Sequence, residues 1–410
     1  MNFLLVALGT GGDIRPCIRL GGELCRRGHT VILAGPEPYQ DLAEAAGLDF
    51  TSVLSRELYD AALSNPDFWH PRRFFGVVLQ GLMVPATRPI VELGLSLPRA
   101  QEWRLVSTYL ALPATRILQE LLDWPRFCLW FAPAGIVSLE ATPLICGWEW
   151  VTPMPRWIRW LFYRLNEVNI DRLVEPALRE VRMSAGLAPA PKVLAWMQAG
   201  AIHLWLFPRW FAAPAADWPR PGFQTGFLLG DDESLQSELE AFLAAGPAPA
   251  VVTFGTGQRH GQESFRQAVA TCRSLNLRVV LVSPHLPPTA PEDDVFHVAT
   301  APFGALFARA RVVIHHGGVG TAAQALAAGI PQLLVPMAHD QPDNAARLEA
   351  LGAGLNLGST GLSGMRTRLA RLLAQDRPGA VAANATDLTC QVLLDQNPGA
   401  GVSGVQLEQP

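Results

Sequence analysis

The sequence has no excess of basic residues. Its 410 residues include 32 Lys and Arg against 36 Asp and Glu, a formal net charge of −4, and charges of both signs are spread along the chain. A surface for nucleic acid needs concentrated basic side chains to neutralise phosphates. We therefore expect no nucleic-acid partner.

Cysteine is scarce, and nothing in its arrangement suggests a metal site or a disulfide framework. The six cysteines form no CxxC pair, and no His, Cys and carboxylate cluster has metal-ligand spacing. Scattered thiols suit a reducing compartment. We expect a cytoplasmic protein that needs no metal and no bound cofactor.

Long hydrophobic runs are also missing. No unbroken apolar run reaches the roughly 20 residues of a membrane-spanning helix; the nearest, 127–139, is interrupted by Pro133. The N-terminal residues 1–8 lack a basic region and run into Gly9, which favours a buried strand over a signal peptide. These absences predict neither a membrane span nor a leader.

The chain contains 49% hydrophobic residues, which is enough for two hydrophobic cores in a chain of this length. Both halves show an apolar strand, a glycine-rich turn, a helix and a second strand. In the first half the strands are 3–8 and 31–34, with a helix beginning near Pro16; in the second they are 250–254 and 278–283, with a helix over 264–275. The pattern predicts an α/β protein with two Rossmann-like, doubly wound parallel-sheet domains facing each other across a cleft.

The expected domain boundary is a stretch rich in proline and aromatic residues, whose composition suits an ordered, stiff connector. We predict a first domain over 1–206, a connector over 207–230, a second domain over 231–380, and a C-terminal helix with a loose tail over 381–410. The helix is expected to return toward the first domain.

The most informative segment is 311–321, Arg-Val-Val-Ile-His-His-Gly-Gly-Val-Gly-Thr. An apolar strand here ends in a glycine-rich turn and a helix start, where unpaired backbone N–H groups and the helix dipole favour a phosphate. The residues expected to hold a diphosphate are His315, His316, Gly317, Gly318, Gly320 and Thr321, facing Gly255 and Thr256 of another turn. Taken singly, His315 is expected to be mainly structural and His316 mainly functional.

A second polar motif, His339-Asp340-Gln341, follows the next predicted strand, 332–336. Parallel strands end at the same edge of a sheet, which is the usual ligand crevice of α/β folds. His339, Asp340 and Gln341 are therefore candidates for binding sugar hydroxyls. The alternative is that Asp340 and Gln341 only cap the helix predicted over 342–351.

Asp13 ends the glycine-rich turn of the first half, on the edge that faces the cleft. A carboxylate there could take a proton from an acceptor hydroxyl, and partial burial would raise its pKa toward a useful value. The alternative is that Asp13 is the N-cap of the helix that begins near Pro16. Gly11 and Gly12 are expected to lie against the acceptor.

These residues resemble family 1 glycosyltransferases of the two-Rossmann (GT-B) type, particularly the sterol and antibiotic branch. The start of those proteins, Gly-Thr-x-Gly-Asp-x-x-Pro, stands here at 9–16, and the resemblance continues through 27–31, 210–219, 225–227, 301–302 and the histidine motif. It covers nearly the whole chain. Within the family, the connector and 338–344 look most like the rhamnosyltransferases of rhamnolipid synthesis.

The resemblance implies inverting transfer from a nucleotide-sugar, with Asp13 as the base. His316, Gly318, Gly320 and Thr321 match diphosphate-binding positions, and Asp340 and Gln341 match the contacts to sugar hydroxyls. Two departures stand in the nucleoside site: Gln324 replaces an acidic residue for the ribose, and the region of Thr300 and Ala301 lacks the usual tryptophan. Both favour a dTDP donor over a UDP donor, with dTDP-rhamnose as the leading hypothesis.

The acceptor is argued from a stretch over 148–164 that is rich in tryptophan and arginine. Trp157 and Trp160 could line an apolar pocket with a cationic mouth for a lipid-like acceptor such as a hydroxy-fatty acid ester, or could rest on an anionic membrane surface. The alternative is an amphipathic helix packed on the core. A lipid acceptor would also imply a partner enzyme that supplies it.

Two other classes of function share this architecture. A nucleotide-sugar epimerase would keep the diphosphate site but need acid and base groups on both faces of the sugar, and a non-catalytic partner would keep only the fold. The Asp13 turn and the Asp340-Gln341 pair favour transfer. A dinucleotide-binding oxidoreductase fits less well, because residues 9–13 lack GxGxxG spacing.

Overall fold

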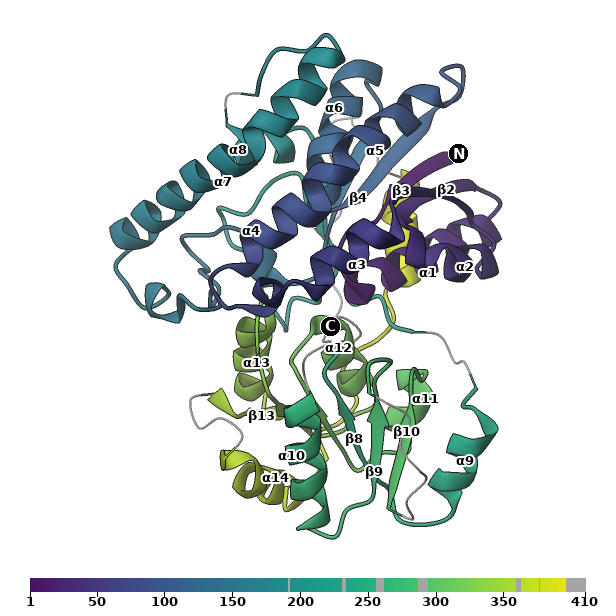
Figure 1. The fold of residues 1–410 in the computed structure, drawn as a ribbon, viewed down its shortest axis with the longest axis vertical. Coiled ribbons are helices and arrows are strands. Elements are labelled where there is room, and N and C mark those ends of the chain that lie inside the picture. Colours follow the sequence, from purple (N-terminus) through teal and green to yellow (C-terminus); the bar gives the residue numbers. More distant parts are fainter. Residues whose placement is uncertain are drawn as a thin grey trace.

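The computed structural model describes residues 1–190, 192–230, 234–255, 262–286, 294–358, 363–375 and 377–395. Two α/β domains lie one above the other in Figure 1. Each is built on a central sheet, and the paired strands of the described residues all run parallel. The predicted fold class is confirmed.

The first sheet has seven strands in the order β3-β2-β1-β4-β5-β6-β7. Nearly every side chain of β1, β4 and β5 is buried, which explains why these strands are continuous apolar runs rather than alternating ones. The strands are β1 (Asn2–Val6), β2 (Thr30–Pro36), β3 (Asp49–Leu54), β4 (Trp103–Thr108), β5 (Arg126–Trp130), β6 (Ile202–Trp205) and β7 (Gly222–Gln224).

Helices cover both faces of this sheet, and one of them, α7, extends beyond the body of the domain (Figure 1). The helices are α1 (Gly11–Arg26), α2 (Gln40–Ala45), α3 (Arg56–Ser64), α4 (Phe74–Val78), α5 (Val84–Ser96), α6 (Leu112–Leu122), α7 (Arg156–Ser184) and α8 (Val193–Gln198). Short helical turns follow β2, α3, β4 and β5: η1 (Glu37–Tyr39), η2 (Pro66–Trp69), η4 (Tyr109–Ala111), η5 (Pro133–Gly135) and η6 (Glu149–Val151).

The second sheet has six strands in the order β10-β9-β8-β11-β12-β13. Its strands are β8 (Ala250–Thr253), β9 (Val279–Val282), β10 (Val295–Val298), β11 (Val312–His315), β12 (Gln332–Leu334) and β13 (Gly354–Asn356). The surrounding helices are α9 (Ser237–Ala244), α10 (Gln262–Arg273), α11 (Phe303–Ala308), α12 (Val319–Ala327), α13 (Gln341–Ala350) and α14 (Met365–Leu373).

Strand order reverses between β1 and β4 in the first sheet and between β8 and β11 in the second. Ligands of open α/β sheets bind at such a point, outside the carboxyl ends of the strands. Asp13 follows β1, and His316 follows β11 directly. The topology therefore sets the candidate base and the candidate diphosphate loop at the two switch points.

The segment predicted as a connector is partly a strand of the first sheet. Strand β7 pairs with β6, so residues up to Gln224 belong to the first domain although 207–221 has the composition of a linker. Phe207, Phe211 and Phe227 are buried in a hydrophobic cluster that also contains residues of α12 and α13. The connector is thus packed against both domains.

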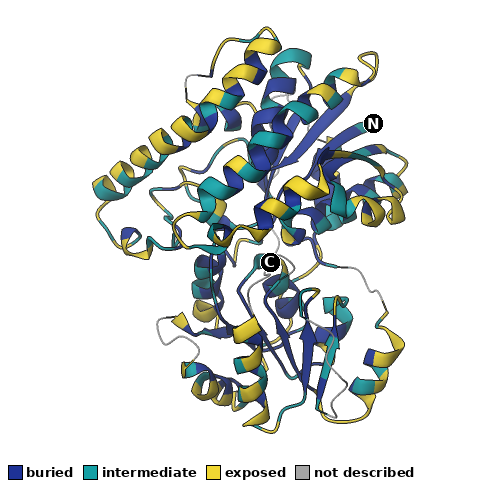
Figure 2. Ribbon diagram, viewed as in Figure 1, coloured by how far each residue is buried: buried dark blue, intermediate teal, exposed yellow. Residues whose placement is uncertain are grey.

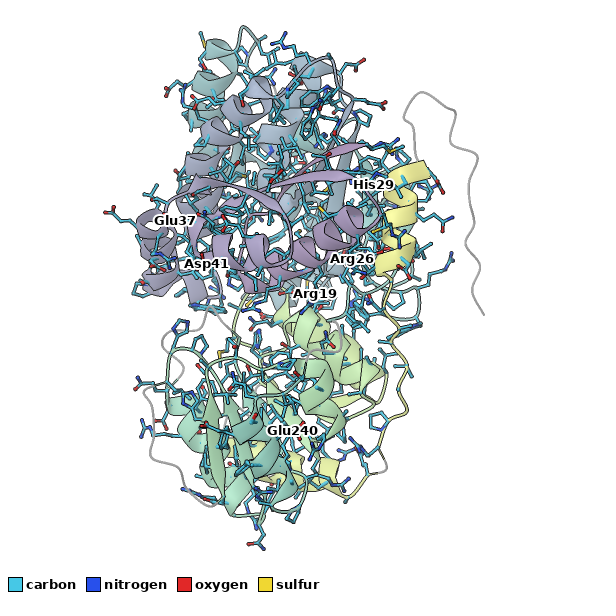
Figure 3. All side chains as sticks on the ribbon, turned by 90° about the vertical axis from the view of Figure 1, so that its right-hand side faces the viewer. Arg19, Arg26, His29, Glu37, Asp41 and Glu240 are labelled. Atoms are coloured by element: carbon cyan, nitrogen blue, oxygen red, sulfur yellow. The ribbon has the colours of Figure 1, made fainter. Side chains whose placement is uncertain are left out.

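The last described helix, α15 (Thr386–Asp395), lies beside α1 of the first domain, as the yellow ribbon in Figure 3 shows. Cys390 and Leu393 are buried in the core of that domain, and Arg27 pairs with Asp387. The predicted tail, 397–410, lies outside the described residues.

One helix bears on the expectation that the chain has no membrane span. Residues Phe74–Ser96, formed by α4, the π-helical η3 (Leu79–Met83) and α5, are long and apolar enough to cross a membrane by length and composition alone. Scattered polar residues and prolines break the run in the sequence, so a search for unbroken apolar stretches misses it. In the fold this helix packs on α6, α7 and β3.

Candidate active site

Asp13 lies in the first turn of α1, since the helix begins at Gly11 rather than near Pro16. The N-cap is Thr10, and Asp13 is the third helical residue, so the interpretation of Asp13 as N-cap is wrong in position. Its Oδ2 accepts hydrogen bonds from the Thr10 backbone N–H at 2.8 Å and the Thr10 hydroxyl at 3.4 Å. The carboxylate therefore closes a capping box with one of its two oxygens.

Burial, with a smaller contribution from the negative charge of Asp340 in the other domain, raises the pKa of Asp13 to about 6. The hydrogen bonds from Thr10 oppose this shift. The carboxyl group is thus mostly ionised at neutral pH yet more basic than an exposed aspartate, which is what a general base requires.

The turn before α1 is shaped around this carboxylate. Gly9 has φ +136°, and a Cβ there would lie 2.3 Å from Asp13 Oδ2. The Tyr59 hydroxyl donates to the Gly9 carbonyl at 3.2 Å and lies 3.1 Å from the Tyr39 hydroxyl. Gly11 is buried and Gly12 is exposed, so of these two acceptor candidates only Gly12 is open to solvent.

His315, at the end of β11, is fully buried, and both ring nitrogens are engaged inside the protein. Nδ1 accepts from the Gly317 N–H at 3.2 Å, so Nε2 is the donor to Gln332 Oε1 at 3.0 Å. The ring has no donor left for a diphosphate. His315 therefore has a structural role, in agreement with the expectation for this residue alone and against its place among the diphosphate ligands.

His316 occupies the turn itself and is the histidine with an unused ring nitrogen. Its ring is hydrogen-bonded to the Thr253 carbonyl, and Nδ1 has no partner among the described residues. Burial lowers the pKa of His316 to about 4, so the ring is neutral at pH 7. Because a neutral imidazole has a single N–H, which the Thr253 backbone engages, the other ring nitrogen can donate to an anion only after taking up a proton.

The glycines around His316 keep the loop close to the ring. Gly317 and Gly255 have φ of +89° and +85°, and a Cβ at Gly255 would lie 3.0 Å from the His316 ring. Gly318 is the N-cap of α12, so Gly320 and Thr321 fall in its first turn with its free N–H groups. Thr256 lies outside the described residues.

Asp340 is the N-cap residue of α13, but its side chain caps no backbone group. Its Oδ2 accepts from Asn344 Nδ2 at 2.7 Å, and the same nitrogen lies 3.0 Å from the Gly317 carbonyl. Burial raises the pKa of Asp340 to about 6. Asn344 therefore connects the predicted diphosphate loop with the predicted sugar ligand, and sequence reasoning did not single it out.

The Gln341 side chain bonds to the turn that precedes α13 and does not cap the first turn of the helix. Its Oε1 accepts from the N–H groups of Met337 at 2.8 Å and Ala338 at 3.0 Å. The side-chain oxygen is thus committed to the turn, and the amide NH2 group is the part of Gln341 that remains for a sugar hydroxyl.

The His339 ring lies against aromatic side chains of the first domain. The His339 backbone is left-handed, with φ +58°, and the ring packs edge-on against three aromatic rings of the first domain. The centroid distances are 4.5 Å to Phe74, 5.1 Å to Trp69 and 5.3 Å to Phe68. The left-handed backbone turns the ring into this aromatic cage, so His339 makes a contact between the domains, while its Nε2 has no hydrogen-bond partner among the described residues. The assignment of His339 to the donor sugar stays a prediction.

The region expected to bind the nucleoside lies where the domains meet. Gln324 is buried on α12, and an ideal Cβ at Gly230 would lie 2.8 Å from Gln324 Nε2 and 3.0 Å from Arg19 Nη2 of α1. Arg19 is labelled on α1 beside the second domain in Figure 3. Thr300 is exposed and Ala301 half-buried. Arg19 is a second residue that sequence reasoning missed, since no motif marks it.

Trp157 and Trp160 project from α7 into solvent, with 66% and 52% of their surface exposed. Neither lines the cavity of about 840 Å³ that opens between the domains, and Asp13, His316 and Asp340 do not line it either. That cavity is lined by residues of both domains, including His70, Arg72, Cys146, Met337 and Asn356.

Several contacts hold the two domains around this cavity. The Asp343 carboxylate of α13 accepts from the Leu144 N–H of the first domain at 2.9 Å, and the Cys146 thiol lies 3.9 Å from the Met337 carbonyl. The described residues contain no group of three or more His, Cys, Asp or Glu side chains that could hold a metal ion.

Comparison with known proteins identifies the family of this chain. Residues 280–401 match the family model of the erythromycin biosynthesis protein CIII-like, C-terminal domain. The chain is 32% identical to O-mycaminosyltylonolide 6-deoxyallosyltransferase of Streptomyces fradiae over 86% of this chain and 84% of that protein. It is 30% identical to glycosyltransferase GtfE of Amycolatopsis orientalis over 87% and 85% of the two chains.

Solved structures agree in fold. The calicheamicin glycosyltransferase CalG4 superposes with a TM-score of 0.64 at 22% identity, covering 92% of this chain and 90% of that one. The spinosyn rhamnosyltransferase SpnG, in complex with thymidine diphosphate, gives 0.58 at 21% identity, with 96% and 95% covered. On the strength of the shared sequence and the paired sheets, the chain belongs to the family 1 glycosyltransferases of the GT-B fold.

Proposed function

We propose that this glycosyltransferase transfers its sugar with inversion of configuration at the anomeric carbon. Asp13 acts as the general base toward a hydroxyl of a hydrophobic acceptor. The observation that carries the proposal is the buried Asp13 carboxylate, whose pKa of about 6 is raised partly by Asp340 of the opposite domain. Thr10 holds Oδ2, which leaves Oδ1 to receive the hydroxyl proton.

In the proposed step the acceptor oxygen attacks the anomeric carbon as its proton passes to Asp13. The bond from that carbon to the diphosphate oxygen breaks, and the nucleoside diphosphate leaves with the electron pair. Attack from the Asp13 side and departure on the His316 side give inversion. The α12 N-terminus and its glycine turn supply donors for the departing charge.

No metal is required in this proposal. His316 is neutral before the donor binds, and the diphosphate would raise its pKa and favour a second ring proton, which makes the second ring nitrogen a donor. Full activity after exhaustive chelation is expected. Loss of activity that Mg²⁺ restores would contradict the proposal.

For the donor we propose a dTDP-sugar, with dTDP-rhamnose as the first to test. Gln324, in place of an acidic ribose ligand, suits a deoxyribose with one hydroxyl fewer. The spinosyn rhamnosyltransferase of the same fold was solved with thymidine diphosphate. A thermal-shift panel of nucleotides tests the base, because a ligand of the native state raises the unfolding temperature with its affinity. Stronger stabilisation by UDP than by dTDP would overturn this choice.

For the acceptor we propose a hydroxylated lipid such as a hydroxy-fatty acid ester, supplied by a partner enzyme at the inner face of the membrane. The second candidate is the hydroxyl of a polyketide or sterol. The similarity to a glycosyltransferase named for its action on O-mycaminosyltylonolide favours that candidate. The subgroup resemblance to rhamnolipid enzymes stays a prediction.

One experiment separates the classes of function. The purified chain is incubated with a dTDP-sugar and either a hydroxy-fatty acid ester or a macrolide, and the products are analysed by mass spectrometry. A glycoside supports transfer and its identity selects the acceptor. An isomerised nucleotide-sugar would show an epimerase, and unchanged substrates would favour a non-catalytic partner.

A further inference from the structure

Helix α7 carries an apolar surface that the fold leaves uncovered. In Figure 1 its N-terminal half extends beyond the body of the first domain, and in Figure 2 that half is mostly half-buried or exposed. Its buried side chains begin only at Ile170 and continue with Val174, Leu178 and Val181. The N-terminal half is therefore held by fewer core contacts than the rest of the helix.

The exposed side chains of this half form two adjacent rows with a spacing of four residues, which is one face of a helix. The first row is Trp157, Leu161 and Leu165, and the second is Trp160, Arg164, Val168 and Arg172; all seven are exposed. Such a face inverts the usual pattern, in which the solvent side of a surface helix is polar. We name these seven residues the α7 face.

Basic charge accompanies the apolar side chains. Residues 156–172 contain four arginines (Arg156, Arg159, Arg164, Arg172) against Glu167 and Asp171. The two acids are committed within the protein: Glu167 pairs with Arg164, and Asp171 accepts the Val193 N–H at 3.0 Å. Arg156 and Arg172 have no ion-pair partner in the described part of the chain.

We propose that the α7 face docks on an anionic lipid bilayer. Tryptophan, leucine and arginine on one helical face are the side chains that bury into the headgroup region and attract acidic lipids. A second copy of the chain suits this face less well. In a symmetric dimer the face meets itself, and because Glu167 balances only Arg164, Arg172 leaves each copy of the face with a net positive charge.

Docking on this face brings the interdomain cavity close to the membrane. Phe162 of α7 packs on Trp148 at 5.5 Å between ring centroids, and Arg159 donates to Thr142 at 2.9 Å. The same loop contributes Leu144 and Cys146 to the cavity lining. If the acceptor is a lipid, as in the proposed function, the bilayer is its source; the docking itself does not depend on that acceptor.

The test is co-sedimentation of the full chain with vesicles, in the absence of donor and acceptor. Wild type is expected to bind vesicles of phosphatidylglycerol with phosphatidylcholine and to bind pure phosphatidylcholine much more weakly. The charge variant R164Q/R172Q should bind the anionic vesicles about 25-fold more weakly, about fivefold for each arginine removed. The apolar variant L161S/L165S should lose at least about tenfold.

A matched control replaces two equally exposed apolar residues away from the face, L58S/M183S, and is expected to bind like wild type. Thermal unfolding of each variant verifies that these surface changes leave the fold intact. Wild type that ignores anionic vesicles, or face variants that bind as well as wild type, would overturn the proposal. So would a dimer in sedimentation velocity that L161S/L165S dissociates without any vesicle binding, since a second copy would then be the occupant.

Discussion

Gly9 and Asp13 are fitted to each other: a Cβ on Gly9, whose φ is +136°, would lie 2.3 Å from the Asp13 Oδ2 atom and 2.6 Å from Cγ. Only a glycine allows the turn to hold the carboxylate in this position, because real Cβ contacts are never so short and because φ is positive. The position of the proposed base thus depends on a neighbour that has no side chain.

Replacing Gly9 by alanine is expected to remove most activity, since the added methyl group displaces Asp13 from its hydrogen bonds with Thr10. We expect a fall in kcat/KM of about 10²-fold, as for loss of a general base. Gly28→Ala is the matched control, because Gly28 also has positive φ, +83°, with nothing within 4 Å of the added Cβ. Gly28→Ala should lower stability by about 1 kcal/mol and leave kcat/KM unchanged. Equal kcat/KM for both variants would refute the dependence of Asp13 on Gly9.

Asp13→Asn is expected to lower kcat/KM about 10²- to 10⁴-fold while stabilising the protein at pH 7. The folded pKa of about 6 exceeds the ordinary 3.8, so the ionised carboxylate costs stability above pH 6, on the order of 3 kcal/mol. This cost disappears as pH falls from 6 to 4, because the folded state takes up the proton first.

Thermal unfolding at pH 7 and pH 4 measures this difference directly. Asp41→Asn, at an exposed position of α2, is the control and should change neither stability nor turnover. An Asp13→Asn variant that is inactive but less stable than wild type at pH 7 would indicate that Asp13 is only a helix cap.

The pH dependence of kcat/KM should have an acid limb with an apparent pKa near 6, where Asp13 loses the proton and becomes a base. Asp340→Asn removes a negative charge that raises this pKa, so the limb should move to lower pH even as donor binding weakens. Initial rates between pH 4.5 and 8, a range of about one to two units around the limb, test this. An unmoved limb would show that Asp340 does not act on Asp13.

We expect His315 to contribute to stability and His316 to contribute to binding of the donor. His315→Ala leaves Gln332 without its partner and should lower the free energy of unfolding by about 1–3 kcal/mol. His316→Ala should lower kcat/KM about 10²-fold and weaken dTDP binding, measured by calorimetry. If a fully folded His315→Ala variant lost as much dTDP affinity as His316→Ala, the structural assignment of His315 would be wrong.

His339→Asn tests the contact between the domains. Asparagine tolerates the left-handed backbone, φ +58°, but cannot fill the cage formed by Phe68, Trp69 and Phe74. We expect higher KM values for donor and acceptor, because the sugar-binding turn is no longer held against the first domain. Asn276→Ala, at a left-handed position on the far side of the second domain, controls for backbone strain. A change in the donor KM alone would assign His339 to the sugar site.

The sequence by itself determined the two parallel-sheet domains and the sheet edges at which the candidate site residues lie. Apolar runs, glycine turns and helix periodicity are local patterns, and parallel strands put the residues that follow them at one edge. Asp13 after β1 and His316 after β11 could therefore be assigned from the chain alone. The structural role of His315 could also be expected, because a side chain at a strand end meets the neighbouring strand, and His315 pairs with Gln332 of β12.

Only the tertiary structure decided which side chains meet across the domains. The ring of His339 enters an aromatic cage, Trp157 and Trp160 stay in solvent, and Asn344 joins Gly317 to Asp340. These outcomes depend on a left-handed backbone, on the packing of α7 and on contacts between residues far apart in the chain. Local sequence patterns do not predict such contacts, because the energy of each contact depends on residues that only the folded chain brings together.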